Sequence, residues 1–81
     1  MRFQILHESS GRVRLRAVQP SMSMEQADLL EAWLLTLPGV EHVTVHERVC
    51  GIIIVFHSER TALYESLAAF SYERAEEETH V

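Results

Sequence analysis

An alternation of arginine with aliphatic residues at positions 12–18, RVRLRAV, is the feature that most limits what this chain can fold into. Successive side chains of a β-strand point to opposite faces, so the segment predicts a strand with Val13, Leu15 and Ala17 facing a core and three arginines facing outward. A strand of this kind belongs to a sheet with one buried face and one face in solvent. We therefore expect the helices to cover only one side of the sheet.

Strand-like patterns occur in four segments of the sequence: residues 2–7, 12–18, 40–48 and 52–57. The first two are separated by turn residues 8–11, where Gly11 can adopt a positive φ, and they predict a β-hairpin. Leu6 interrupts the strict alternation of the first strand. The last two strands are separated by a predicted turn at residues 49–51.

Two helices are expected between and after these strands. Ser23 and Gln26 have the spacing of a capping box and place a helix start near Met24, and Pro38 stops that helix at about Leu37. Ser58 is expected to cap a second helix that begins at Glu59 and buries Leu63, Leu67 and Phe70.

The order of these elements predicts an α+β fold: a ferredoxin-like βαββαβ sandwich, with an antiparallel sheet and two helices on one face. The last strand of that plan is missing, and we expect the N-terminal hairpin strand to occupy its place at the sheet edge. Residues 1–72 form the predicted domain. Residues 73–81 are expected to be a polar, acidic tail or linker, either a helical extension or a frayed end.

Composition narrows the class of protein. The 81 residues are 47% hydrophobic and 23% charged, as in a soluble single domain, and the net charge of −5 argues against a nucleic-acid-binding protein. Cys50 is the only cysteine, which excludes an internal disulfide and favours a reducing, cytoplasmic compartment. We predict no signal peptide and no membrane span, so any membrane association would come from a partner or a parent chain.

Two motifs resemble a known family. His7 followed by GRVRLR at residues 11–16, and LPGV at residues 37–40 before a valine-rich strand, resemble the heavy-metal-associated domains at the cytoplasmic amino termini of metal-transporting P-type ATPases. The likeness covers residues 3 to about 70 and is stronger for the variant subgroup with H-x3-GR-x-R-x-R in place of a metal-binding cysteine pair. It implies a non-catalytic regulatory domain of a transporter whose ATP-driven phosphoryl transfer takes place elsewhere.

The metal ligands of the wider family are not carried over. Its metal-binding members use C-x-x-C before the first helix, whereas residues 19–24 read QPSMSM. An alternative is a metal-binding module that uses Met22, Met24 and a histidine, because thioethers suit copper(I). Met22 is equally well placed to be a hydrophobic staple before the Ser23 cap. We expect no resident metal and no cofactor.

The remaining candidate ligands are scattered. His42 and His46 share a strand face but lie about 13 Å apart. His57 ends a strand, and Cys50 is either an accessible thiol or a small residue in a tight turn. The acidic run from Glu76 to His80 would bind a metal only loosely. No catalytic set is recognised, so the chain is not expected to be an enzyme.

The candidate interaction residues are Arg12, Arg14, Arg16 and His7. One interpretation is a solvated outer face whose arginines pair with Glu8 or Glu41. The other is a docking stripe for an acidic protein surface, such as another cytoplasmic domain of a parent transporter, or for an anionic membrane surface.

A further interpretation is a free-standing interaction domain that forms a homodimer through an exposed edge strand. The leading hypothesis remains a non-catalytic cytoplasmic regulatory or interaction domain with a degenerate metal site.

Overall fold

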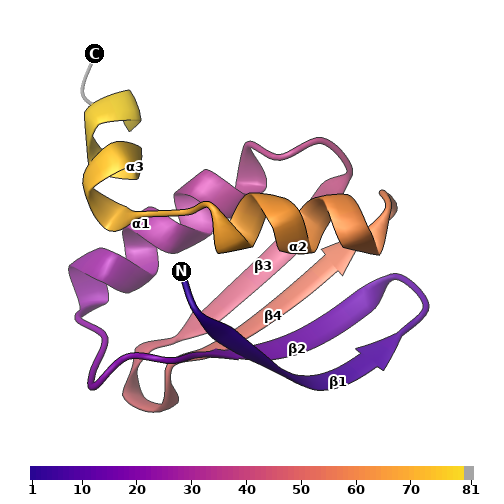
Figure 1. Cartoon of the computed structure of the whole chain (residues 1–81), viewed down its shortest axis with the longest axis horizontal. Coiled ribbons are helices and arrows are strands. Elements are labelled where there is room, and N and C mark those ends of the chain that lie inside the picture. Colours follow the sequence, from indigo (N-terminus) through magenta and orange to yellow (C-terminus); the bar gives the residue numbers. More distant parts are fainter. Residues whose placement is uncertain (80–81) are drawn as a thin grey trace.

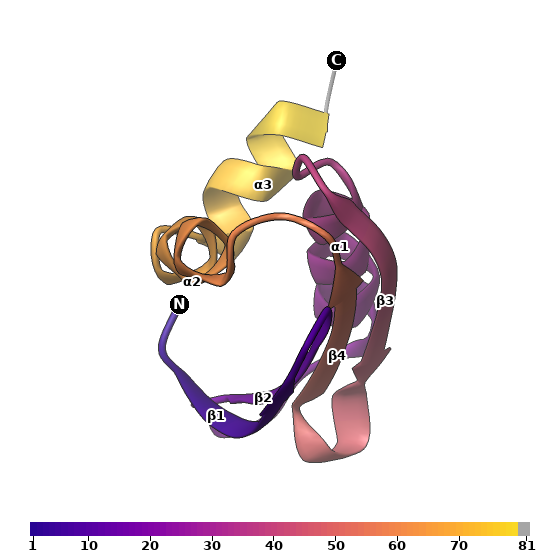
Figure 2. The same ribbon diagram turned by 90° about the vertical axis from the view of Figure 1, so that its right-hand side faces the viewer.

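The computed structural model describes residues 1–79, which form an antiparallel sheet of four strands and three α-helices. The elements in chain order are β1 (Phe3–Ser9), β2 (Arg12–Ala17), α1 (Met24–Leu35), β3 (Val40–His46), the 3-10 turn η1 (Glu47–Val49), β4 (Gly51–Phe56), α2 (Arg60–Ala68) and α3 (Tyr72–Thr79). Figures 1 and 2 show the sheet curving around the helices, which lie on its concave side. The predicted α+β fold of ferredoxin-like type is confirmed.

The strand order is β1-β2-β4-β3, and each neighbouring pair is antiparallel. β1 therefore pairs with β2 at the sheet edge, in the place that the last strand occupies in a ferredoxin-like plan. The hairpin turn includes Gly11, whose φ of 78° lies in the left-handed region that glycine tolerates. Both predictions for the N-terminal hairpin are confirmed.

The core lies between the sheet and the helices. Val13, Leu15 and Ala17 on β2 are buried, while the residues between them are exposed, so the alternation has the predicted direction. The largest fully buried side chains come from β2, β4 and the first two helices: Leu15, Leu30, Leu34, Ile52, Ile54, Leu67 and Val13.

The start of α1 follows the capping box. Ser23 Oγ accepts a hydrogen bond of 3.0 Å from the backbone N–H of Gln26, and Gln26 Oε1 accepts one of 3.1 Å from the N–H of Ser23. Met22, the preceding residue, is buried in the core. The helix ends at Leu35, two residues before its predicted end.

The predicted cap of the second helix is wrong. α2 begins at Arg60 after the N-cap residue Glu59, and no side chain makes a capping hydrogen bond there. Ser58 lies against Gly39 instead, so close that a Cβ added at Gly39 would be 2.5 Å from Ser58 Cβ. Ser58 therefore lies against the α1–β3 loop, one residue before the N-cap of α2.

Residues after α2 continue as a packed helix. Phe70 follows α2, and its ring centroid lies 4.6 Å from that of Trp33 and 5.1 Å from that of Tyr72. Ala75 of α3 is buried, so the helical-extension interpretation is confirmed as far as Thr79. His80, part of the acidic run considered as a loose metal site, lies outside the described residues.

Candidate interaction face

The three arginines of β2 project from the side of the sheet that no described helix covers. The strand register places Arg12 beside Ser9 and Val55, Arg14 beside His7 and Ile53, and Arg16 beside Gln4 and Gly51. We call this surface the open sheet face, and its paired positions are Gln4, His7, Ser9, Arg12, Arg14, Arg16, His42, Thr44, His46, Gly51, Ile53 and Val55. No position in this described set is acidic.

His7 reaches the open sheet face because of a β-bulge. The register of β1 shifts between Ile5 and His7, so Leu6 is an extra residue without a partner. Strict alternation from Phe3 would place His7 on the helix side. After the bulge, His7 pairs with Arg14 and Glu8 pairs with Val13. The break in alternation at Leu6 in the sequence thus corresponds to the bulge. The bulge places His7 on the same face of the sheet as the arginines.

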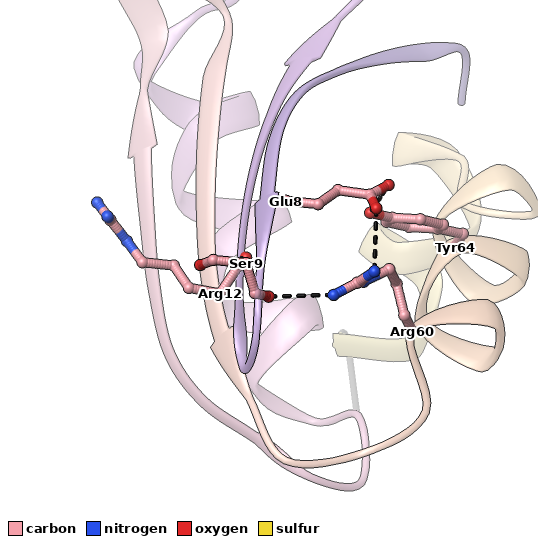
Figure 3. Close-up of polar contacts among 5 residues, drawn as sticks. All are labelled: Glu8, Ser9, Arg12, Arg60 and Tyr64. Atoms are coloured by element: carbon pink, nitrogen blue, oxygen red, sulfur yellow. Dashed lines mark hydrogen bonds and ion pairs between the residues drawn. The ribbon is translucent and has the colours of Figure 1, made fainter.

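Glu8 contacts Arg60 and Tyr64 of α2, and not the arginines of β2 as expected. Its carboxylate accepts hydrogen bonds of 3.0 Å from Arg60 Nη1 and of 3.0 Å from Tyr64 Oη, while Arg60 Nη2 donates to the carbonyl of Ser9 at 3.1 Å (Figure 3). Figure 3 also shows Arg12 pointing away from this cluster. The expected partial pairing of Glu8 with the arginines of β2 is therefore wrong, because Glu8 pairs with Arg60 instead.

The second expected acidic partner, Glu41, is also directed elsewhere. Its carboxylate lies 3.7 Å from His57 Nε2. Within residues 1–79, the side chains of Arg12, Arg14 and Arg16 form no hydrogen bond or ion pair, and all three are exposed. Their positive charge is thus left to solvent or to a partner.

The contacts of Glu8 affect the ionisation of Tyr64. Partial burial, the hydrogen bond to Glu8 and the charge of that carboxylate raise the pKa of Tyr64 to about 12 from an ordinary 10.0, against the opposing effect of Arg60. The folded chain then keeps the phenol proton in a pH range where the unfolded chain loses it. Stability should therefore fall as the pH rises from about 10 to about 12.

We expect the substitution Glu8→Gln to lower the pKa of Tyr64, because the carboxylate that opposes phenolate formation is removed. Alkaline titration of the tyrosinate absorbance measures this in a Tyr72→Phe background, where Tyr64 is the only tyrosine. The same titration with Glu8 intact is the control. An unchanged pKa would contradict the hydrogen bond between Glu8 and Tyr64.

Charge is divided between the two sides of the molecule. Eight of the twelve acidic residues belong to the sequences of the three helices, whereas three of the seven arginines lie on the open sheet face. An acidic protein thus has one face with exposed arginines and histidines. A partner with negative charge would be attracted to this face and repelled by the helical layer.

A hollow interrupts the open sheet face beside Arg14 and Arg16. Gly51 has Arg16 and His46 as its cross-strand partners and contributes no side chain between them. The hollow has a volume of about 330 Å³ and is lined by Leu6, Arg14, Leu15, Arg16, His46, Val49, Gly51, Ile52 and Ile53. It combines apolar walls with two guanidinium groups.

The apolar members of this surface were not foreseen from the sequence. Leu6 and Val49 are 41% and 60% exposed, and Ile53 is half-buried within an aliphatic run typical of a central strand covered on at least one face. The only sequence signal was the position of Leu6, which breaks the alternation. The run Gly51–Phe56 gives no sign of which residues face outward, because both of its faces are apolar.

The other predicted ligands do not converge. Met22 is buried whereas Met24 is 67% exposed, so their sulfur atoms belong to different environments. Cys50 is also buried, in a left-handed conformation with φ 54°, which supports its interpretation as a small residue in a turn. Among the described residues, no three side chains of the His, Cys, Asp or Glu type lie close enough to hold one metal ion.

The fold and this surface define a class of protein: a small α+β domain of ferredoxin-like type, with helices on one face of its sheet and arginines on the other. No helix in the described part of the chain has the length and apolar character needed to cross a bilayer. The chain matches no family model, and no curated protein sequence is significantly similar to it. Its function must therefore be inferred from the open sheet face.

Proposed function

We propose that the chain is a non-catalytic interaction domain that docks through its open sheet face onto an acidic protein surface. The observation that carries this proposal is the row formed by Arg12, Arg14 and Arg16, which have no acidic neighbour at the paired positions of the described sheet. Solubility alone would not require three guanidinium groups in a row, and lysine would serve equally well for it.

Arginine side chains in this arrangement suit carboxylates. A guanidinium can form two parallel hydrogen bonds with a carboxylate, which gives both attraction and a defined orientation. Alternate residues on one strand are about 7 Å apart, the same spacing as alternate side chains of an extended acidic segment. An extended segment along β2 would therefore meet the arginines one carboxylate at a time.

A nucleic-acid partner is disfavoured by the position of the aromatic residues. Sheets that bind single-stranded RNA stack bases on exposed aromatic side chains. All six aromatic residues of this chain instead pack against the core: Phe3, Trp33, Phe56, Tyr64, Phe70 and Tyr72. An anionic membrane is disfavoured because surface attachment usually needs four to eight basic residues, and this acidic protein offers about half of that number on one face.

The resemblance to the variant amino-terminal domains of metal-transporting P-type ATPases supports a regulatory form of this function. The residues that carry its H-x3-GR-x-R-x-R motif, His7, Arg12, Arg14 and Arg16, share one surface. In such a parent, the partner would be another cytoplasmic domain of the same transporter. The domain would then report the state of the transporter by docking, without carrying the ion.

The proposal is tested with a fluorescein-labelled hexaglutamate peptide and fluorescence polarisation. The double substitution Arg12→Glu and Arg14→Glu should weaken binding by roughly tenfold or more, because two favourable ion pairs become repulsive. The matched control is Arg74→Glu with Ala62→Glu and Ala68→Glu, which changes the net charge by the same amount at exposed positions of α2 and α3.

If the docking-face variant and the control variant weaken binding equally, the effect is one of net charge and the proposed docking face is wrong. Hexaglutamine should not bind measurably to the unmodified chain. Circular dichroism of each variant establishes that the fold is retained.

The metal-binding alternative gives a separate prediction. Because Met22 is part of the core and Met24 is exposed, one ion cannot reach both sulfur atoms without opening the start of α1. Titration with copper(I) or zinc should therefore leave the backbone amide NMR shifts of Met22 to Glu25 unchanged at sub-micromolar metal. Saturating shifts at these amides would favour the metal-binding module instead.

A further inference from the structure

We infer that the hollow beside Arg14 and Arg16 holds an aliphatic side chain of the docked partner, so that the preferred ligand is an extended acidic segment with an aliphatic residue among its carboxylates. This inference rests on the proposed function and specifies the chemistry of its partner. It adds an apolar contact site for the partner to a face that the sequence alone predicts only to be basic.

Gly51 contributes no side chain to the hollow, although its place in the register is on the outward face of the sheet. Its neighbours across the sheet, Arg16 on β2 and His46 on β3, both face outward. The depression has a volume of about 330 Å³, and Arg16, His46 and Gly51 all line it. An aliphatic side chain of leucine or isoleucine size fits such a volume with room for part of the adjoining backbone.

Apolar side chains line this depression on two sides. Leu6 comes from the β-bulge, where the extra residue has no partner in the sheet, and it is 41% exposed. Val49 comes from η1 and is 60% exposed. Covering them with an aliphatic group removes apolar surface from water on both molecules, which favours binding.

The positive charges around the hollow favour a ligand with carboxylates on either side of its aliphatic residue. Arg14 and Arg16 are both part of its lining, so a carboxylate two residues from the aliphatic one, on the same face of the extended segment, would reach a guanidinium. An acyl chain with an anionic headgroup has related chemistry. Surface attachment to an anionic bilayer usually needs four to eight basic residues, however, and the open sheet face has three arginines, so we commit to a protein segment.

The experiment compares three labelled peptides, EELEE, EESEE and QQLQQ, by fluorescence polarisation. EELEE should bind roughly five- to tenfold more tightly than EESEE, because only leucine can fill the hollow. The substitutions Leu6→Ser and Val49→Ser should each reduce this preference. Ile5→Ser is the matched control, since Ile5 is similarly exposed, at 47%, but pairs with the inward-facing Leu15.

In NMR titrations, EELEE should shift the amide signals of Gly51 and Ile53 more strongly than EESEE does. Equal affinities of EELEE and EESEE would overturn the hollow as a leucine site while leaving the arginine docking face intact. Equal binding of QQLQQ and EELEE would overturn the docking face itself. Preferential binding to phosphatidylserine-containing vesicles over EELEE would also overturn the inference.

Discussion

Replacing Gly39 by alanine is expected to lower the free energy of unfolding by roughly 2–4 kcal/mol, through backbone strain and steric overlap together. Gly39 has a φ of 83°, and its added Cβ would lie 2.5 Å from Ser58 Cβ and 3.0 Å from the backbone nitrogen of Ser58. The carbonyl of Gly39 also accepts a hydrogen bond of 2.8 Å from the N–H of His57. The loop cannot move away without breaking this bond.

Urea denaturation followed by circular dichroism measures the loss, with Gly51→Ala as the matched control. Gly51 has no positive φ, and the nearest atom to its added Cβ is a methyl carbon of the exposed Val49, at 3.3 Å. A methyl group there should change stability by less than about 1 kcal/mol, because the exposed side chain can rotate away. Equal losses in the two variants would show that the contact between Gly39 and Ser58 is not responsible.

Replacing Phe70 by alanine is expected to cost about 3–5 kcal/mol of stability, the usual range for removing a buried phenylalanine. Phe70 is buried between the rings of Trp33 and Tyr72, so it connects α1 with the start of α3. Its carbonyl also accepts a hydrogen bond of 2.7 Å from the amino group of Met1. The cavity would therefore open at a junction of three parts of the chain.

Hydrogen exchange shows whether α3 unfolds together with the rest of the domain in this variant. If α3 unfolds together with the rest of the domain, the amides near Ala75 and those of α1 should lose protection together in Phe70→Ala. Phe70→Leu, which fills part of the cavity, should restore part of the stability. Loss of protection near Ala75 alone, with α1 still protected, would show that residues 72–79 behave as a tail on an independent domain.

The division of charge has a consequence for the rate of docking. An acidic partner approaching the helices meets like charge, whereas one approaching the open sheet face meets the three arginines. Association should therefore be accelerated by electrostatic steering and slowed by added salt. The apolar hollow would contribute mainly to the lifetime of the complex, because its contacts form only after close approach.

Local rules predicted the parts of this fold that depend on neighbouring residues. The alternation at residues 12–18 and the capping box at Ser23 and Gln26 appear in the structure as expected. The edge position of β1 was predicted because the last strand of the ferredoxin-like βαββαβ plan is missing from the sequence. The alternation also identified the three arginines as outward-facing, so the basic half of the candidate face was predictable.

The failures have a common physical cause. Glu8 was expected to pair with the arginines of β2, but after the bulge at Leu6 it lies on the helix side of the sheet, where it contacts Arg60 and Tyr64 of α2. Ser58 has the composition of a helix cap, but its contact with Gly39 holds it outside α2. In both cases a distant segment determined the outcome.

By itself the sequence determined which strand would carry the arginines and that their face would not be covered by helices, because strand periodicity is a local property of the backbone. Only the tertiary structure decided that Glu8 turns to Arg60 and Tyr64, that His7 joins Arg14, and that a hollow lies over Gly51. Those features depend on strand register and on residues far apart in the chain, which local patterns do not encode.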